Sequence, residues 1–246
     1  MKYNITRILV LTLSSVAITG GLRAAPPTAA EVGEVESFGH NVQYMGAVSG
    51  FITLSPACTP APPPVPPATA NDDQCFTLAA APALTNFDAE DILRIKLPKK
   101  ATRTIIYPAL NFFINYQLQN STGVFQPQGL FSFTASITIE SDVLLNPSII
   151  DPSTGLPANG KLVGQFSYAF RDDRSMDVNA RQRQRETLVR VGNAGINKAQ
   201  LVASGLSESV VDDLFKNAMT IRMSVTGSEK LLTDASITCN MRLFGD

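Results

Sequence analysis

The chain has 246 residues, with 20 Lys and Arg against 21 Asp and Glu, one His, three Cys and no Trp. This length allows a sizeable hydrophobic core without the help of a metal or many disulfides. A content of 44% hydrophobic and 17% charged residues excludes a disordered chain and a strongly basic nucleic-acid-binding protein. A single His excludes a three-His zinc site within the chain and leaves little for His-based nucleophilic catalysis.

Residues 1–25 have the pattern of a secretory signal peptide. Lys2 and Arg7 precede an apolar stretch, and small residues follow it up to Ala24 and Ala25. Thr and Ser residues interrupt the apolar stretch, which favours a cleaved signal over a membrane anchor. Its removal deletes three bases and no acid, leaving 17 bases, 21 acids and a formal charge of −4. We therefore predict a secreted or periplasmic protein with no later transmembrane segment and no affinity for nucleic acid.

The mature chain is predicted to have a flexible start at 26–40 and a single domain at 41–246, with a Pro-rich loop at 58–75. Cys58 and Cys75 bracket that loop, and in an oxidising compartment we expect them to form a disulfide. Closing a loop of this length contributes about 3 kcal/mol in the chain-entropy model. Zinc is the alternative, but two Cys without a nearby Cys or His cannot complete a tetrahedral site. Cys239 lies on an apolar strand face and is predicted to be a buried, inert thiol.

Alternation of apolar and polar residues predicts strands that each have one buried face. The clearest segments are 131–140, 219–226 and 235–242, and weaker ones are 42–54, 92–97, 106–118, 162–170 and 187–191. One polar face per strand favours antiparallel sheets, because parallel sheets are buried on both sides. Residues 227–234 are typical of a hairpin connection between the last two strands. We predict a mainly β protein, an antiparallel β-sandwich of about seven to nine strands.

Residues 197–218 break this pattern and predict one or two short helices over an end or edge of the sheets. Their apolar residues recur every four positions, at Leu206, Val210, Leu214 and Ala218. A first helix can begin at Asn197 and end at Gly205. Either Ser207 or Ser209 can cap the second. Core packing is a sufficient explanation of the apolar stripe.

The most polar region, at 171–190, contains six Arg and four acidic residues. If the chain is extended there, Arg181, Arg183 and Arg185 project from one face about 7 Å apart. Guanidinium groups in such a row can hold carboxylates, sulfates or phosphates of an envelope polymer. A charged edge strand that prevents aggregation is the simpler interpretation, because it needs no partner.

The same region contains a small group of oxygen-bearing side chains, namely Asp172, Asp173, Asp177 and Asn179. Carboxylate oxygens are Ca²⁺ ligands, but the group lacks the spacing and the glycine of an EF-hand loop. Arg171 and Arg174 also lie among the acids, so we predict a solvated turn. We predict no metal and no cofactor.

No residue set in the sequence predicts catalysis. His40 has no nucleophile motif such as G-x-S-x-G to accompany it, and we expect it at the surface. Asn120 begins a glycosylation sequon that matters only in a eukaryotic host. The sequence favours a non-enzymatic protein with a structural, adhesive or ligand-binding role in the cell envelope or outside the cell. Its expected partner is an envelope polymer or another surface protein. The alternative is a secreted hydrolase or lyase that acts on an extracellular polymer through paired carboxylates, which leave no local signature.

Overall fold

The computed structural model describes residues 43–58, 73–192 and 195–246. The strands in these residues are β1 (Gln43–Ser55), β2 (Gln74–Thr77), β3 (Leu84–Leu97), β4 (Ile105–Gln119), β5 (Gln126–Glu140), β6 (Lys161–Met176), β7 (Arg181–Val191), β8 (Ile196–Asn197), β9 (Met219–Lys230) and β10 (Leu232–Gly245). The helices are the 3-10 helix η1 (Asp142–Leu145), α3 (Lys198–Ala203) and α4 (Glu208–Lys216). The predicted signal peptide at 1–25, the flexible segment at 26–40 and His40 lie outside the described residues.

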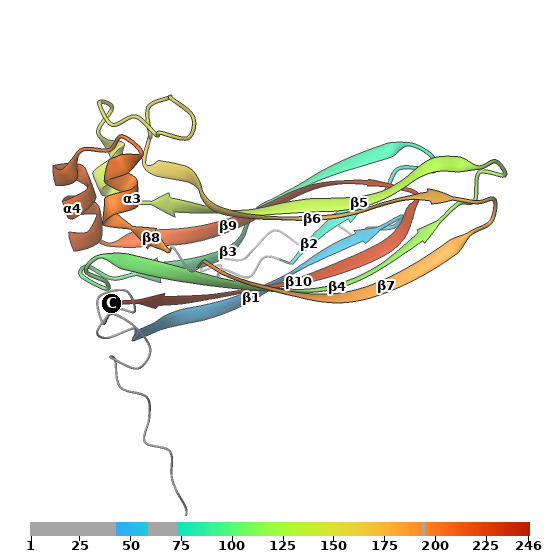
Figure 1. Cartoon of the computed structure of the whole chain (residues 1–246), viewed down its shortest axis with the longest axis horizontal. Helices are drawn as coiled ribbons and strands as arrows, with labels where there is room; N and C mark the ends of the chain where they lie inside the picture. The colour runs from blue at the N-terminus through green and yellow to red at the C-terminus, as the bar shows by residue number, and fades with distance from the viewer. Residues whose placement is uncertain (1–42, 59–72, 193–194) are drawn as a thin grey trace, which may run out of the picture. The chain divides into compact units, whose positions relative to one another are not determined.

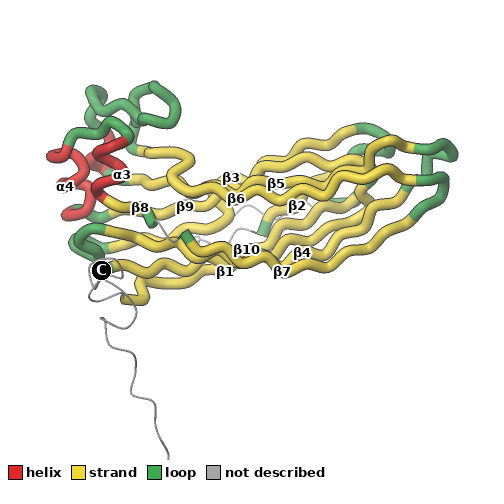
Figure 2. Tube along the Cα trace, in the orientation of Figure 1, coloured by secondary structure: helices red, strands yellow, loops and turns green. Residues whose placement is uncertain are grey.

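The strands form two sheets that pack as layers, which confirms the predicted β-sandwich (Figure 1). One sheet has the order β2-β1-β10-β4-β7, with β8 also paired to β4, and the other has the order β3-β9-β5-β6. The described strands number ten, against the seven to nine expected. The strands that the sequence did not reveal are β2 and β8, with four and two residues, which are too short to show alternation. The helices lie together at one end of the sheets (Figure 2).

Most strand pairs are antiparallel, as predicted, but β1 and β2 pair in parallel. The register places Thr53 opposite Cys75 and Leu54 opposite Phe76. A parallel pair cannot be closed by a tight hairpin, because the chain must return to the same end before the second strand begins. The predicted Pro-rich loop lies between these two strands in the sequence, and its residues 59–72 are outside the described residues.

The core between the sheets contains a layer of aromatic side chains from β4, β5 and β6. The rings are those of Phe112, Tyr116, Phe131, Phe133, Tyr168 and Phe170. The Tyr116 and Phe131 centroids are 4.8 Å apart, and those of Phe112 and Phe133 are 5.5 Å apart. Tilted pairs at such distances contribute about 0.5–1.5 kcal/mol each beyond the burial of their area. These contacts join β4 of the larger sheet to β5 and the edge strand β6 of the smaller sheet.

Cys239 faces the same core from β10, as its position on the apolar phase predicts. It is fully buried and unpaired among the described residues. Burial raises the pKa of its thiol to about 12, because the thiolate would have to exist without solvent. Cys239 is therefore a core side chain and a poor nucleophile.

The predicted hairpin at 227–234 is wrong. β9 and β10 belong to different sheets, and each continues through the segment expected to be the connection. The chain crosses from one sheet to the other at Leu231, which has a φ of 63°. Both strands place their apolar faces in the same interior, so alternation indicates that both are buried without indicating which strand each one pairs with.

In the first predicted strand, at 42–54, alternation places Tyr44 in the same apolar phase as Ile52 and Leu54, and this phase holds only for the second half of β1. Ile52 and Leu54 are fully buried, but Tyr44 is 64% exposed. The pairing with β10 shifts register between Tyr44 and Gly46, which marks a β-bulge. A bulge adds one residue to the strand, so the residues that precede it lie on the opposite face from the one that alternation predicts. Tyr44 precedes this bulge and therefore points outward.

Both predicted short helices are present. The side chain of Asn197 caps α3 by accepting a hydrogen bond from the backbone N–H of Gln200, at 2.7 Å. Ser207 rather than Ser209 caps α4, and accepts from the backbone N–H of Val210. Leu214 and Phe215 bury the inner face of α4. No helix in the described ranges combines the length and hydropathy needed to cross a bilayer.

The carboxyl group of Glu229 lies in the interior of the sandwich. Glu229 of β9 is 1% exposed, and its Oε2 accepts a hydrogen bond from the backbone N–H of Leu232 at 3.2 Å. Its Oε1 has no hydrogen-bond partner among the described residues. Burial raises the pKa of Glu229, and hydrogen bonds from Thr85 and Leu232 offset only part of that effect.

A pH-dependent cost of folding follows from this burial. Between the ordinary pKa of a glutamate and the raised pKa of Glu229, the folded chain holds a proton that the unfolded chain has lost. The free energy of unfolding therefore falls as the pH rises through that window. We expect Glu229→Gln to raise it by about 1 kcal/mol at pH 8 and to leave it nearly unchanged at pH 4. Urea unfolding at both pH values measures this, with the exposed Glu90→Gln as control. A gain that is equal at both pH values would contradict the explanation.

Candidate functional site

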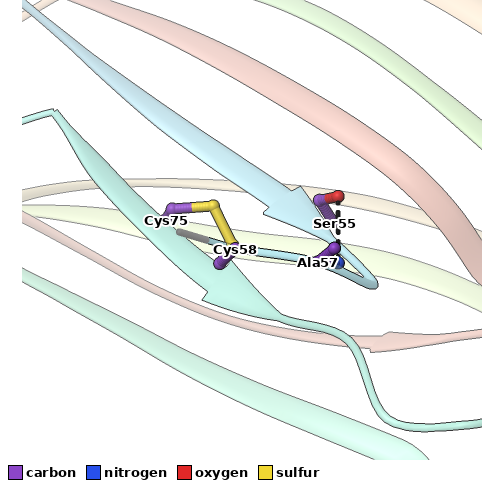
Figure 3. Close-up of a disulfide and its surroundings, with 4 residues drawn as sticks. All are labelled: Ser55, Ala57, Cys58 and Cys75. Atoms are coloured by element: carbon purple, nitrogen blue, oxygen red, sulfur yellow. Dashed lines mark hydrogen bonds between the residues drawn. A yellow bond between two sulfur atoms is a disulfide. The ribbon is translucent and has the colours of Figure 1, made fainter. Parts of the chain in front are cut away.

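A disulfide fastens the edge of the larger sheet (Figure 3). Cys58 and Cys75 are bonded as the sequence predicts, with their Cα atoms 5.6 Å apart. Cys75 lies in β2 at the edge of the sheet, and Cys58 follows β1, where the Ser55 hydroxyl accepts a hydrogen bond from the Ala57 N–H. A four-residue edge strand makes few ladder hydrogen bonds, so the covalent link holds β2 against β1.

The three predicted arginines lie in a row on the opposite edge of that sheet. Arg181, Arg183 and Arg185 occupy alternate positions of the edge strand β7, and all three are exposed. Within the described residues none of the three guanidinium groups forms an ion pair. The location agrees with both interpretations of the row, as a charged edge and as an anion-binding surface.

The row is continued by amide side chains on the neighbouring strand β4. The register places Gln119, Gln117 and Asn115 opposite Arg181, Arg183 and Arg185. We call these six residues the arginine–amide face. Phe113 follows on the same side of β4 and is 46% exposed. The face therefore combines three cations, three amides and an adjacent exposed ring.

The amides of this face differ in their burial and in their hydrogen-bond partners. Gln117 is largely buried and donates a hydrogen bond to the Thr233 hydroxyl at 2.8 Å. The Oδ1 atom of Asn115 has no hydrogen-bond partner among the described residues. Gln117 is paired with Asp234 of β10 on one side and with Arg183 of β7 on the other, so one strand separates this acid from Arg183. Sequence analysis found the arginines from their spacing but not the amides, because register alone brings β4 beside β7.

The acidic group predicted as a solvated turn is divided by β6. Asp172 and Asp173 lie within that strand and point to opposite faces, and only Asp177 and Asn179 belong to the following turn. Asp173 binds Arg171 and accepts a hydrogen bond from Gln128, which lowers its pKa. In the described part of the chain, no group of three or more His, Cys, Asp and Glu is placed to hold a metal ion.

Asp172 instead takes part in a polar link between the two sheets. Its carboxylate accepts a hydrogen bond from the Tyr116 hydroxyl at 2.6 Å and is paired with Arg174 at 2.5 Å. Arg174 also donates to Gln182 of β7. Burial of Tyr116 and its contact with Asp172 raise the pKa of the phenol, so it stays a donor. These groups hold β6 against β4 and β7, and their role is structural.

Asn120 has a structural role that prevents use of its sequon. The residue is fully buried. Its Nδ2 donates hydrogen bonds to the carbonyl oxygens of Val124 at 2.7 Å, Met176 at 3.1 Å and Asp177 at 3.1 Å. A glycan attached at this nitrogen would replace one of its two hydrogens, so the three contacts could not all be kept. In this fold Asn120 therefore joins the loop after β4 to the turn after β6.

A cavity of about 400 Å³ lies on the outer face of the smaller sheet, and the sequence did not reveal it. Asp88, Glu90 and Asp91 line it together with Arg222. The guanidinium of Arg222 binds the carboxylates of both Asp91 and Glu140. Asp88 and Glu90 are exposed. The cavity is the concave site with several carboxylates that the alternative function requires.

Comparison with known proteins gives little similarity. No protein-family model and no curated protein matches the chain. A structure of the Gx strain of infectious bursal disease virus matches with 12% identity and a TM-score of 0.19, over 76% of this chain and 36% of that chain. A structure of the T13 IBDV viral particle matches with 8% identity and a TM-score of 0.14, over 76% of this chain and 44% of that chain. The chain thus spans less than half of either structure, and likeness this low carries no argument about function.

The disulfide predicts a measurable loss of stability when it is removed. We expect the double variant Cys58→Ala, Cys75→Ala to lower the free energy of unfolding by about 3 kcal/mol, because its unfolded chain gains loop entropy. Urea unfolding measures the change. A reducing agent should produce a similar loss in the unsubstituted protein and none in the variant. A variant as stable as the oxidised protein would contradict a role for the disulfide in holding β2.

Proposed function

We propose that this chain is an exported, non-enzymatic β-sandwich that binds an anionic polymer of the cell envelope or extracellular space through its arginine–amide face. The observation that carries the proposal is the row of Arg181, Arg183 and Arg185 on edge strand β7, exposed and without ion-pair partners in the described residues. The Cys58–Cys75 disulfide and the signal-peptide pattern at 1–25 support a secreted or periplasmic location.

The regular spacing of the three arginines suits a ligand made of repeating units. Side chains two residues apart on a strand are about 7 Å apart, so the guanidinium groups present a ladder of charges at regular intervals. An exposed ion pair contributes only about 0.2–1 kcal/mol. Three such pairs give weak binding to a single unit, so useful affinity requires a polymer that engages several positions and several copies of the unit.

The remaining groups of the face suit a hydroxylated polymer. Asn115 and Gln119, which are half-buried, bear side-chain amides that both donate and accept hydrogen bonds, whereas the buried Gln117 is already bonded to Thr233. The exposed ring of Phe113 offers an apolar platform on the same side of the sheet. Charge, amides and a ring together fit an acidic polysaccharide better than a neutral one.

Edge protection and polymer binding make different demands on these side chains. A charge that only repels other strand edges can be supplied equally well by Lys. Binding through paired hydrogen bonds requires the planar fork of Arg, which Lys lacks. Substitution by Lys therefore separates the two interpretations while it conserves the charge.

The first test measures binding of the mature protein to polygalacturonate, dextran sulfate and neutral dextran. We expect binding to at least one polyanion and none to dextran, with an affinity that falls as salt is added. The triple variant Arg181→Gln, Arg183→Gln, Arg185→Gln should weaken binding by about tenfold or more, and the triple Lys variant should show an intermediate loss. The triple control Lys96→Gln, Lys99→Gln, Lys161→Gln removes the same charge from other exposed sites. An equal loss in that control, or no binding of either polyanion, would contradict the proposal.

The acidic cavity supports a second candidate function, a hydrolase or lyase. Asp88 and Glu90 both line the cavity, and Glu90 lies where β3 bulges between Ala89 and Leu93. Two carboxylates in one concave site are what paired-carboxylate hydrolysis requires. If the protein turns over glycan, ester or peptide substrates, and Asp88→Asn with Glu90→Gln abolishes that turnover, the enzymatic function replaces the non-enzymatic one. The control Asp234→Asn removes an acid outside the cavity.

A further inference from the structure

A second positively charged site lies at the helical end of the sandwich, on different elements from the arginine–amide face. It is a cavity of about 400 Å³ between the loop that joins β3 to β4 and helices α3 and α4. Its lining residues are Lys100, Thr102, Arg103, Lys198, Phe215 and Lys216. We call it the basic cavity. Four of its six lining side chains carry a positive charge and none carries a carboxylate.

The loop side of the basic cavity is held in place by Asp246. The carboxylate of Asp246 accepts hydrogen bonds from the backbone N–H groups of Arg103, Thr104 and Ile105, at 3.1, 2.9 and 3.1 Å. It also accepts one from the Thr102 hydroxyl at 2.7 Å. Partial burial alone would raise the pKa of Asp246, but these hydrogen bonds outweigh it and lower the pKa. The backbone that carries Arg103 is therefore fixed without use of its guanidinium group.

The positive charges on the helix side of the basic cavity are partly neutralised by acidic residues. Lys198 donates a hydrogen bond to Asp212 at 2.6 Å, and its ammonium lies 5.6 Å from the centre of the Phe215 ring. Lys216 is 3.9 Å from Asp212 and 4.0 Å from Asp213, and is 60% exposed. Ion pairs this exposed and this long contribute little. Acids on α4 thus compensate Lys198 well and Lys216 weakly.

The two cations on the loop side of the basic cavity have no acidic partner among the described residues. Among the described residues, neither Lys100 nor Arg103 forms an ion pair. Both line the cavity opposite Lys198 and Lys216. Cations that converge on one cavity repel each other, and an anion bound between them relieves that repulsion.

We propose that the basic cavity binds a small ligand that carries a phosphate or sulfate group. Ammonium and guanidinium groups from two sides surround an oxyanion better than a single row does. The three terminal oxygens of a phosphate or sulfate group can accept more hydrogen bonds from them than the two oxygens of a carboxylate. The volume is in the range of small-molecule sites, so the oxyanion is one part of a larger ligand. Phe215, which is 3% exposed, gives the cavity an apolar floor. This site does not depend on polymer binding at β7.

Isothermal titration calorimetry of the mature protein tests the proposal, with glucose 6-phosphate and glucose 6-sulfate as probes at constant ionic strength. We expect saturable binding of at least one ester and none of glucose. The double variant Lys100→Gln, Arg103→Gln should weaken that binding by about tenfold or more. Lys99→Gln removes a neighbouring charge that does not line the cavity and should change the affinity by less than about twofold.

The two esters identify the group that the cavity binds, and the variants identify the site of binding. Preference for the phosphate ester identifies a phosphorylated ligand, and preference for the sulfate ester identifies a sulfated one. The β7 triple Gln variant should bind the ester normally, which separates this site from the arginine–amide face. Circular dichroism and urea unfolding confirm that the loop variant is folded. The absence of saturable binding to either ester, or an equal loss in Lys99→Gln, would overturn the proposal.

Discussion

The packing of β4 against β5 and β6 is the contact on which the rest of the structure depends. Phe112 and Tyr116 from one sheet pack against Phe131, Phe133 and Phe170 from the other. Phe170 is half-buried and the other four rings are buried, because their strands alternate apolar and polar residues. Burial of one face per strand leaves the other face free for polar residues. The outer faces can therefore change in sequence without loss of the core, and they carry the charged surfaces of this protein.

Three of the four sheet edges differ in how their edge strand is held or left open. The edge at β2 is short and is fastened by the Cys58–Cys75 disulfide. The edge at β6 is linked to the other sheet through Asp172, Tyr116 and Arg174. The edge at β7 remains open and bears the row of arginines. An open edge with a charged face avoids unwanted strand pairing and remains accessible to a ligand, so the same residues can serve both purposes.

The local sequence pattern predicted most strands and both helices, whereas the two cavities could be found only from the tertiary structure. The β-sandwich, both short helices, the disulfide and the buried Cys239 follow from periodicity, caps and Cys spacing. The crossing at Leu231 was mistaken for a hairpin because alternation does not identify a strand's neighbour. The acidic and basic cavities bring residues from distant segments together, such as Asp91 with Arg222 and Arg103 with Lys198. No spacing within one segment could have shown them.

A double-mutant cycle between Phe112 and Phe133 tests the contact between the sheets most directly. The two residues belong to different sheets and are far apart in sequence, so they interact only if the sheets pack as described. With each residue changed to Leu, urea unfolding should give a coupling energy of about 0.5–1.5 kcal/mol. Phe51 of β1 is paired with Thr238 and lies on the outer face of the larger sheet, whereas Phe112 lies on its inner face. The pair Phe112 and Phe51 should therefore give a coupling near zero. A coupling near zero for Phe112 and Phe133 as well would contradict this packing.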